Sequence, residues 1–84
     1  MIEYRKRIIR AVGKMCKEYR EYIGVTQSEV SQATGYSEQN ISSFETGRTN
    51  NMILLLWYID QGMFKTTYNN ESYKLHRLLR GDTE

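Results

Sequence analysis

The sequence predicts a single small all-α domain of five helices, and three observations support that fold class. The 84 residues contain no proline, the residue that interrupts helices most strongly. Apolar residues recur every three or four positions near the N-terminus, which is the period of one helix face. Between residues 26 and 47, a helix-start signal is followed by a glycine and then by a second helix-start signal, all within a few residues of one another. A chain of this length forms one small core, which a helical bundle can fill.

The first predicted helix covers most of residues 3–22. Its apolar face is formed by side chains at three- and four-residue spacing, namely Tyr4, Ile8, Val12, Met15, Cys16, Tyr19 and Ile23. Gly13 weakens this helix by roughly 1 kcal/mol relative to alanine, and Gly24 ends it. The first ten residues either lengthen the helix or form a loose basic arm, and the sequence leaves both alternatives open.

The second and third predicted helices flank a tight turn. Thr26 and Glu29 form a capping box, in which each residue's side chain accepts from the other's backbone N–H, so the second helix begins at Gln27. Gly35 can adopt the positive φ that ends this helix, and Ser37 caps the third helix. The contact across the turn is expected from the apolar residues Val30, Ala33, Tyr36, Ile41 and Phe44.

The remainder of the chain predicts a loop and two more helices. Turn-forming residues at 48–51 indicate the loop, and the run at 52–60 is apolar all round, so a buried fourth helix is expected there. This run has more apolar surface than so small a domain can hide, and Trp57 and Tyr58 are predicted to face a partner. A fifth helix is expected over Ser72–Arg80, with one apolar face formed by Leu75, Leu78 and Leu79.

Charge is distributed unevenly along the chain, although the net charge is only +2. Residues 1–20 contain seven Lys or Arg against two Glu, a net charge of +5. Residues 21–64 contain one basic residue, Arg48, against five acidic residues, a net charge of −4, and residues 65–84 carry +1. If the central segment binds nucleic acid, most of the electrostatic attraction must therefore come from residues outside it.

The sequence lacks the residues that metal sites, disulfides, catalytic sites and membrane spans require. Cys16 is the sole cysteine, so it forms no internal disulfide, and it lies on the apolar face of the first helix, where burial is expected. Cys16 and His76 are too few to hold a metal, and no cofactor or small-molecule ligand is expected. No catalytic constellation is present, so no enzyme activity is expected. No run is long enough to span a bilayer and no signal peptide is recognisable, so we expect a cytoplasmic protein.

A set of residues in fixed register points to a known family. They are Thr26, Gln27, Ser31, Gly35, Ser37, Ile41, Phe44, Glu45, Gly47 and Arg48. In this register the chain resembles the helix-turn-helix of the Cro and phage-repressor class, the Xre-like DNA-binding domains, over residues 12–62. The resemblance implies a structural pair between Arg20 of the first helix and Glu45. It also divides the single domain, residues 1–84, into a basic N-terminal extension (1–11), the family-like core (12–62) and a C-terminal segment suited to dimerisation (63–84).

The resemblance also implies a DNA-binding site. In this class the third helix lies in the major groove, so the candidates for reading bases are its outward residues Glu38, Gln39, Asn40, Ser42 and Ser43. Glu38 has a competing interpretation, because a carboxylate in the first turn favours the helix dipole and repels phosphate. Contacts with the DNA backbone are expected from Gln27, Thr46, Arg48 and Asn50.

The predicted function is sequence-specific binding of double-stranded DNA by a transcriptional regulator, a small repressor of phage or bacterial type. A homodimer is expected, with an interface formed by Trp57, Tyr58, Leu75, Leu78 and Leu79. The alternative is a protein-binding module on the same fold, namely an antitoxin, an anti-host factor or an accessory factor. That module would act through the acidic helix-turn-helix face or the apolar fourth helix. The basic N-terminal residues either contact DNA or form a solvated face.

Overall fold

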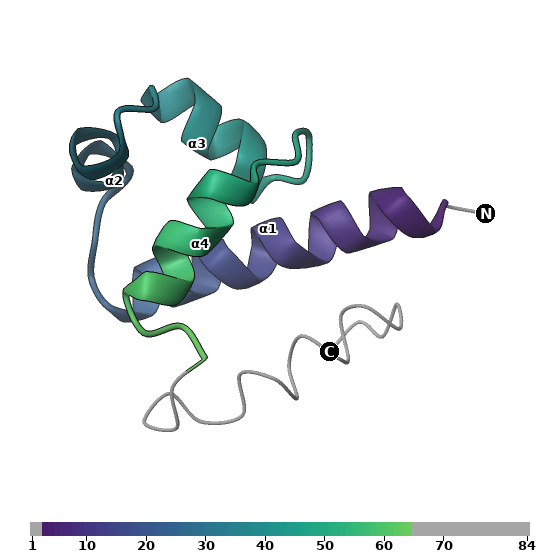
Figure 1. The fold of residues 1–84 in the computed structure, drawn as a ribbon, viewed down its shortest axis with the longest axis horizontal. Helices are drawn as coiled ribbons and strands as arrows, with labels where there is room; N and C mark the ends of the chain where they lie inside the picture. The colour runs from purple at the N-terminus through teal and green to yellow at the C-terminus, as the bar shows by residue number, and fades with distance from the viewer. Residues whose placement is uncertain (1–2, 65–84) are drawn as a thin grey trace.

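The computed structural model describes residues 3–64 and contains four helices and no strand within that range. The helices are α1 (Tyr4–Tyr22), α2 (Gln27–Thr34), α3 (Glu38–Glu45) and α4 (Met52–Asp60), as Figure 1 shows. The prediction of an all-α chain is therefore confirmed for these residues. The predicted fifth helix over Ser72–Arg80 lies outside the described residues.

The first helix runs without interruption from Tyr4, so the residues of the basic extension that the structure describes lengthen α1. Its C-terminal half supplies core residues, because Met15, Cys16 and Tyr19 are buried. Tyr4, by contrast, was predicted on the apolar face and is 65% exposed, since α1 projects past the other helices at its N-terminal end (Figure 1). The extension is therefore a helix that protrudes at Tyr4 and is increasingly covered toward Ala11, which is buried.

Gly13 has a packing role that the sequence did not reveal. A Cβ atom at this position would lie 2.2 Å from the carbonyl oxygen of Phe44 and 2.9 Å from that of Glu45. The backbones of α1 and α3 therefore meet at a distance that only glycine permits. The prediction that Gly13 only weakens α1 was incomplete. Glycine has a low helix propensity, but here it allows α1 and α3 to pack closely.

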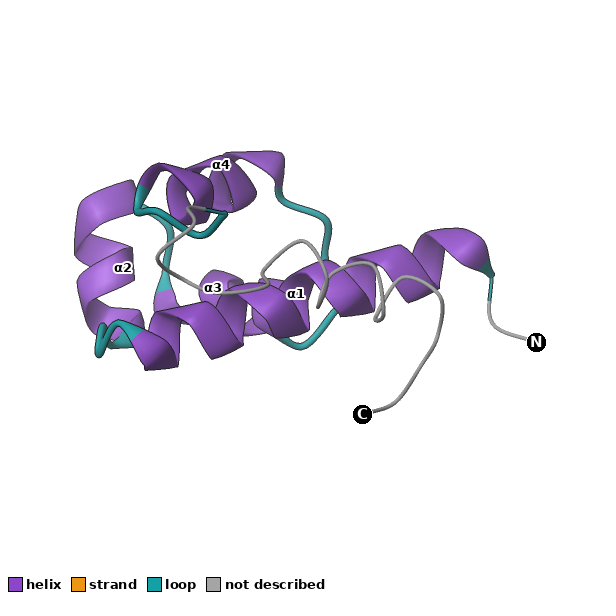
Figure 2. Cartoon of the chain, turned by 90° about the horizontal axis from the view of Figure 1, so that it is seen from below, coloured by secondary structure: helices purple, strands orange, loops and turns teal. Residues whose placement is uncertain are grey.

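The core lies where α1, α3 and α4 meet, with α2 at one end of the molecule beside the C-terminal part of α1 (Figures 1 and 2). Its buried members are Met15, Cys16, Tyr19, Val30, Ile41, Phe44, Leu54, Tyr58 and Met63. Of the residues predicted to lock α2 on α3, Val30, Ile41 and Phe44 are buried and Tyr36 is half-buried. Ala33 is exposed, so its predicted contact across the turn was wrong. At the end of an eight-residue helix, its short side chain lies on the face turned to solvent.

The fourth helix was predicted to be buried, with some excess apolar surface, and the structure shows which side chains are exposed. Leu54 and Tyr58 are fully buried, whereas Met52, Ile53 and Leu56 are 67%, 58% and 53% exposed. The reason is that α4 crosses only one layer of the domain, so nothing among the described residues covers its outer face. Within residues 3–64, no helix has both the length and the apolar character needed to cross a membrane.

Candidate nucleic-acid interface

The turn between α2 and α3 is fixed by backbone caps at both sides. The Thr26 hydroxyl accepts from the Glu29 amide (3.1 Å), and the Glu29 carboxylate accepts from the Thr26 amide (2.9 Å). Gly35 has φ +85° and donates its N–H to the Ser31 carbonyl, and the Ser37 hydroxyl accepts from the Asn40 amide (3.1 Å). Both predicted helix starts and the glycine turn are confirmed. The caps give hydrogen-bond partners to backbone amides that would otherwise be unpaired, so the helix ends do not fray. The start of α3 is therefore fixed relative to α2.

The outward face of α3 is polar and open to solvent. Ile41, Phe44 and Glu45 turn inward and are buried. At about 100° per residue, Gln39 and Ser43 lie opposite that buried face. Of the residues predicted to read bases, Glu38, Gln39 and Asn40 are exposed, and Ser42 and Ser43 are half-buried. The arrangement presents the exposed Gln39 amide on the outward side of α3, with the half-buried Ser43 hydroxyl one helical turn later on the same side.

Glu38 lies at one side of this face, close to the N-terminus of α2. It lines a shallow hollow together with Thr26, Gln27 and Ser28. Its carboxylate therefore adds negative charge next to the helix end where a phosphate contact was predicted. In this position the Glu38 carboxylate is better suited to repelling anions near the N-terminus of α2 than to reading bases beside Gln39 and Ser43.

The four residues predicted to contact the DNA backbone fall into two groups. Arg48 and Asn50 are exposed on the loop between α3 and α4. Gln27 and Thr46 already have partners: the Gln27 amide donates to Glu45 (3.1 Å), and the Thr46 hydroxyl donates to the Ser42 carbonyl (2.9 Å). Thr46 is exposed as well, but its hydroxyl donates within α3, whereas Arg48 and Asn50 are exposed on the loop that follows.

A buried polar network joins all four helices at one carboxylate. Arg20 of α1 donates from Nε to Glu45 Oε2 (2.8 Å) and from Nη2 to Glu45 Oε1 (3.0 Å), and its Nη1 donates to the Val25 carbonyl (2.9 Å). Gln27 of α2 donates to Oε1, and the Tyr58 hydroxyl of α4 donates to Oε2. Glu45 is only 3% exposed. Its position at the last turn of α3 is therefore fixed relative to every other helix.

The network sets the protonation of its members. Burial raises the pKa of Glu45, but hydrogen bonds from Arg20, Tyr58 and Gln27 outweigh it, so the net pKa is lowered. Burial, followed by the hydrogen bond to Glu45, raises the pKa of Tyr58 well above its ordinary value. The charged form of Glu45 and the neutral form of Tyr58 are thereby stabilised. Sequence reasoning named Arg20 and Glu45 but missed Gln27 and Tyr58 as their partners.

The predicted dimer interface needs correction at Tyr58. This side chain is 0% exposed, and its ring lies 6.2 Å from that of Phe44, so it belongs to the core. Its hydroxyl is directed at Glu45, which explains how a polar group is accommodated there. Trp57 is half-buried. The other predicted interface residues, Leu75, Leu78 and Leu79, lie outside the described residues.

Comparison with known proteins places this architecture in a family. No family model matches the chain, and no solved structure matches it. The chain is 35% identical over 54 residues to an uncharacterized HTH-type transcriptional regulator, y4dJ, of Sinorhizobium fredii (strain NBRC 101917 / NGR234). The match spans 64% of this chain and 70% of that protein. With its two capped helices joined at a glycine turn, the chain belongs to the family of HTH-type transcriptional regulators.

Proposed function

We propose that the chain is a transcriptional regulator that binds double-stranded DNA through the outward face of α3. The observation that carries the proposal is the polar outward face of α3, where Gln39 and Asn40 are exposed, on a helix whose opposite face is held by the Glu45 network. An amide can pair with adenine through two hydrogen bonds, and a hydroxyl can donate to or accept from several bases. A rigid helix carrying such groups can distinguish sequences without reorganising when it binds.

The proposal assigns two kinds of contact to this surface. Gln39, Asn40 and Ser43 on α3 read base edges, and Arg48 and Asn50 on the loop that follows α3 contact phosphates, in agreement with their exposure or half-burial. Because Arg48 is the sole basic residue between residues 21 and 64, its loss should lower the affinity for every DNA sequence. The loss of Gln39 should lower the affinity only for sequences that contain its base partner.

The test starts by selecting a preferred site from a library of random duplexes. On that site, Gln39→Ala should cost roughly 1–3 kcal/mol, with little change on unrelated duplex. Arg48→Ala should weaken binding to both and lower the salt dependence by about one phosphate contact. Enrichment of no sequence from the library would refute sequence-specific binding. Equal losses on both duplexes for both variants would refute the division of roles.

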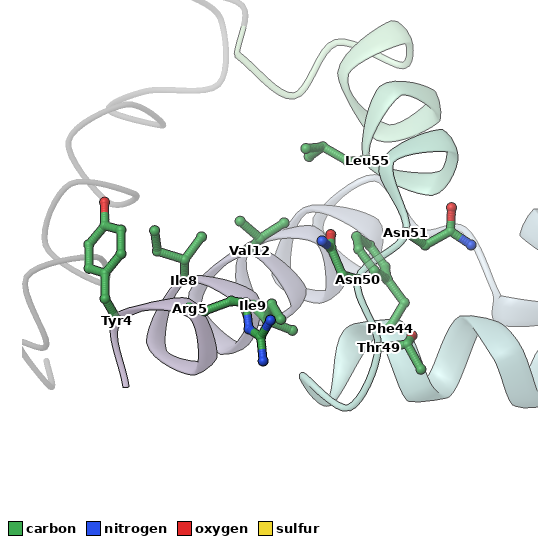
Figure 3. A pocket seen from close by; sticks show the side chains of 10 residues that line it. All are labelled: Tyr4, Arg5, Ile8, Ile9, Val12, Phe44, Thr49, Asn50, Asn51 and Leu55. Carbon is green, nitrogen blue, oxygen red and sulfur yellow. The ribbon is translucent and has the colours of Figure 1, made fainter. Parts of the chain in front are cut away.

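Binding as a homodimer is a further part of the proposal. One recognition helix reads only a few base pairs, and two copies on neighbouring half-sites increase both affinity and specificity. The corrected interface consists of the exposed apolar side chains on the outer face of α4, namely Met52, Ile53 and Leu56. A second apolar surface adjoins α4, where Tyr4, Ile8, Val12 and Leu55 line a groove between α1 and α4 (Figure 3). These surfaces favour a second copy of the chain as the partner.

The repressor role rests on the resemblance to Cro and phage repressors. A regulator that occupies a promoter can block polymerase without any further activity. A reporter gene placed behind the selected site should lose expression when the chain is produced, and the Gln39→Ala variant should restore it. Increased expression would instead assign an activator role.

A further inference from the structure

The N-terminal half of α1 and the loop between α3 and α4 form one basic hollow. It is lined by Arg5, Lys6, Ile9, Arg10, Gly47, Arg48 and Asn50. The four cationic side chains are all exposed, and no carboxylate is among the lining residues. Residues far apart in the sequence, on α1 and on the loop after α3, thus place four positive charges around one hollow.

The close approach of the loop to α1 depends on Gly47. This residue has φ +80°, and a Cβ atom there would lie 2.8 Å from Arg10 Cγ and 2.9 Å from Arg10 Cα. The loop is anchored to the end of α3 as well, because the Arg48 amide donates to the Ser43 carbonyl (2.8 Å). Arg48 is therefore held on the α1 side of α3, where the cations of the extension are located.

Only part of the basic extension contributes to this hollow. Arg5, Lys6 and Arg10 line the hollow, whereas Arg7 does not. The Arg7 guanidinium lies over the ring of Tyr4, 5.5 Å from its centre. Figure 3 shows Arg5 on the loop side of α1, directed away from Tyr4 and Ile8. The structure therefore divides a run of basic residues that looks uniform in the sequence.

The four cations of this hollow have little compensation by negative charge within the described part of the chain. One ion pair involves the cluster there, between Arg5 and Glu3 at 4.0 Å, and both side chains are largely exposed. Such a pair contributes little. Four cations around one hollow repel each other, and a bound anion relieves this repulsion. The hollow is thus chemically suited to an anion with several accessible oxygens.

We propose that Arg5, Lys6, Arg10 and Arg48 bind the phosphodiester backbone of duplex DNA next to the base pairs contacted by α3. The inference rests on the proposed function, because it takes α3 as the helix in the groove. The hollow begins at the residues that directly follow α3, so a DNA strand passing the end of that helix meets it. The positive charge of the extension thereby compensates for the net negative charge of residues 21–64.

Two arginines in the same stretch of α1 provide a matched test. Arg5→Gln and Arg7→Gln remove the same charge from positions two residues apart, and Arg5 alone lines the hollow. Binding of the full chain to a fluorescently labelled duplex of mixed sequence is measured by anisotropy at several salt concentrations. Arg5→Gln and Lys6→Gln should each lower the slope of log K against log salt by about 0.9, the value for one phosphate. Arg7→Gln should leave the slope unchanged.

The controls separate this inference from the function on which it rests. Circular dichroism of each variant confirms that the helices are retained. If the unaltered chain binds duplex and all three variants have equal slopes, the phosphate site is overturned while DNA binding by α3 stands. If the unaltered chain binds no duplex at low salt, the proposed function and the phosphate site both fall.

Discussion

Replacing Gly13 by alanine tests the closest contact in the fold, and the two relevant effects have opposite signs. In an exposed helix, alanine is more favourable than glycine by about 1 kcal/mol. At Gly13, however, the new Cβ would lie 2.2 Å from the Phe44 carbonyl oxygen, and ordinary carbon–oxygen contacts are about 3.3 Å or longer. The helices α1 and α3 must therefore separate by roughly 1 Å.

The expected magnitude follows from these two terms. Overpacking costs typically 1–3 kcal/mol, and the upper end applies because the obstructing atoms belong to the backbone of α3 and cannot rotate away. Subtracting the gain in helix propensity of about 1 kcal/mol leaves a net destabilisation of roughly 2 kcal/mol. For a domain of this size, that lowers the melting temperature by about 8–16 °C.

Thermal and urea denaturation followed by circular dichroism measure the effect. The matched controls are Lys17→Ala and Lys17→Gly, because Lys17 is exposed on the same helix. The difference between these two controls gives the intrinsic cost of glycine in α1. A Gly13→Ala variant that is more stable than the unaltered chain by that same difference would refute the close contact between α1 and α3.

Two further predictions concern the Glu45 network and α4. The lowered pKa of Glu45 means that its contribution to the free energy of unfolding is fully present above the ordinary glutamate pKa, about 4.3, and is lost as pH falls through the lower folded value. Glu45→Gln should be destabilised by about 3–5 kcal/mol at neutral pH and show a weaker acid dependence in urea titrations; parallel pH curves would count against the ionised network. On α4, Leu56→Glu should give a folded monomer by sedimentation, whereas Tyr58→Glu should give unfolded protein. A Leu56→Glu variant that still dimerises would exclude the outer face of α4 as the interface.

The features that the sequence predicted correctly depend on interactions between residues close together in the chain. A capping box, a turn glycine and a serine cap act over three or four residues, so Thr26, Gly35 and Ser37 located α2 and α3 without any knowledge of tertiary structure. The three-and-four spacing of α1 similarly placed Met15 and Cys16 in the core. These signals depend on backbone geometry that neighbouring residues determine.

The features that sequence missed depend on which helix crosses which. From the sequence alone, a glycine that weakens a helix cannot be told from one that lets two helices cross closely. At Gly13 the position of the Phe44 carbonyl shows that it is the second kind. The burial of Tyr58 was missed because an apolar run has no period that marks its inner face. One signal was available: Tyr58 has the only hydroxyl in residues 52–60, and a buried tyrosine needs a polar partner.

The positions of these contacts explain how the outward face of α3 can be varied independently of folding. Gly13 meets the last turn of α3, the Glu45 network holds that same turn, and the Ser37 cap fixes the first. None of the three uses the side chain of Gln39 or Ser43. A substitution on the outward face therefore leaves the placement of α3 intact, because surface changes away from such contacts usually alter stability by less than about 0.5 kcal/mol. For this reason a loss of DNA binding in Gln39→Ala would report a lost contact with DNA and not a displaced helix.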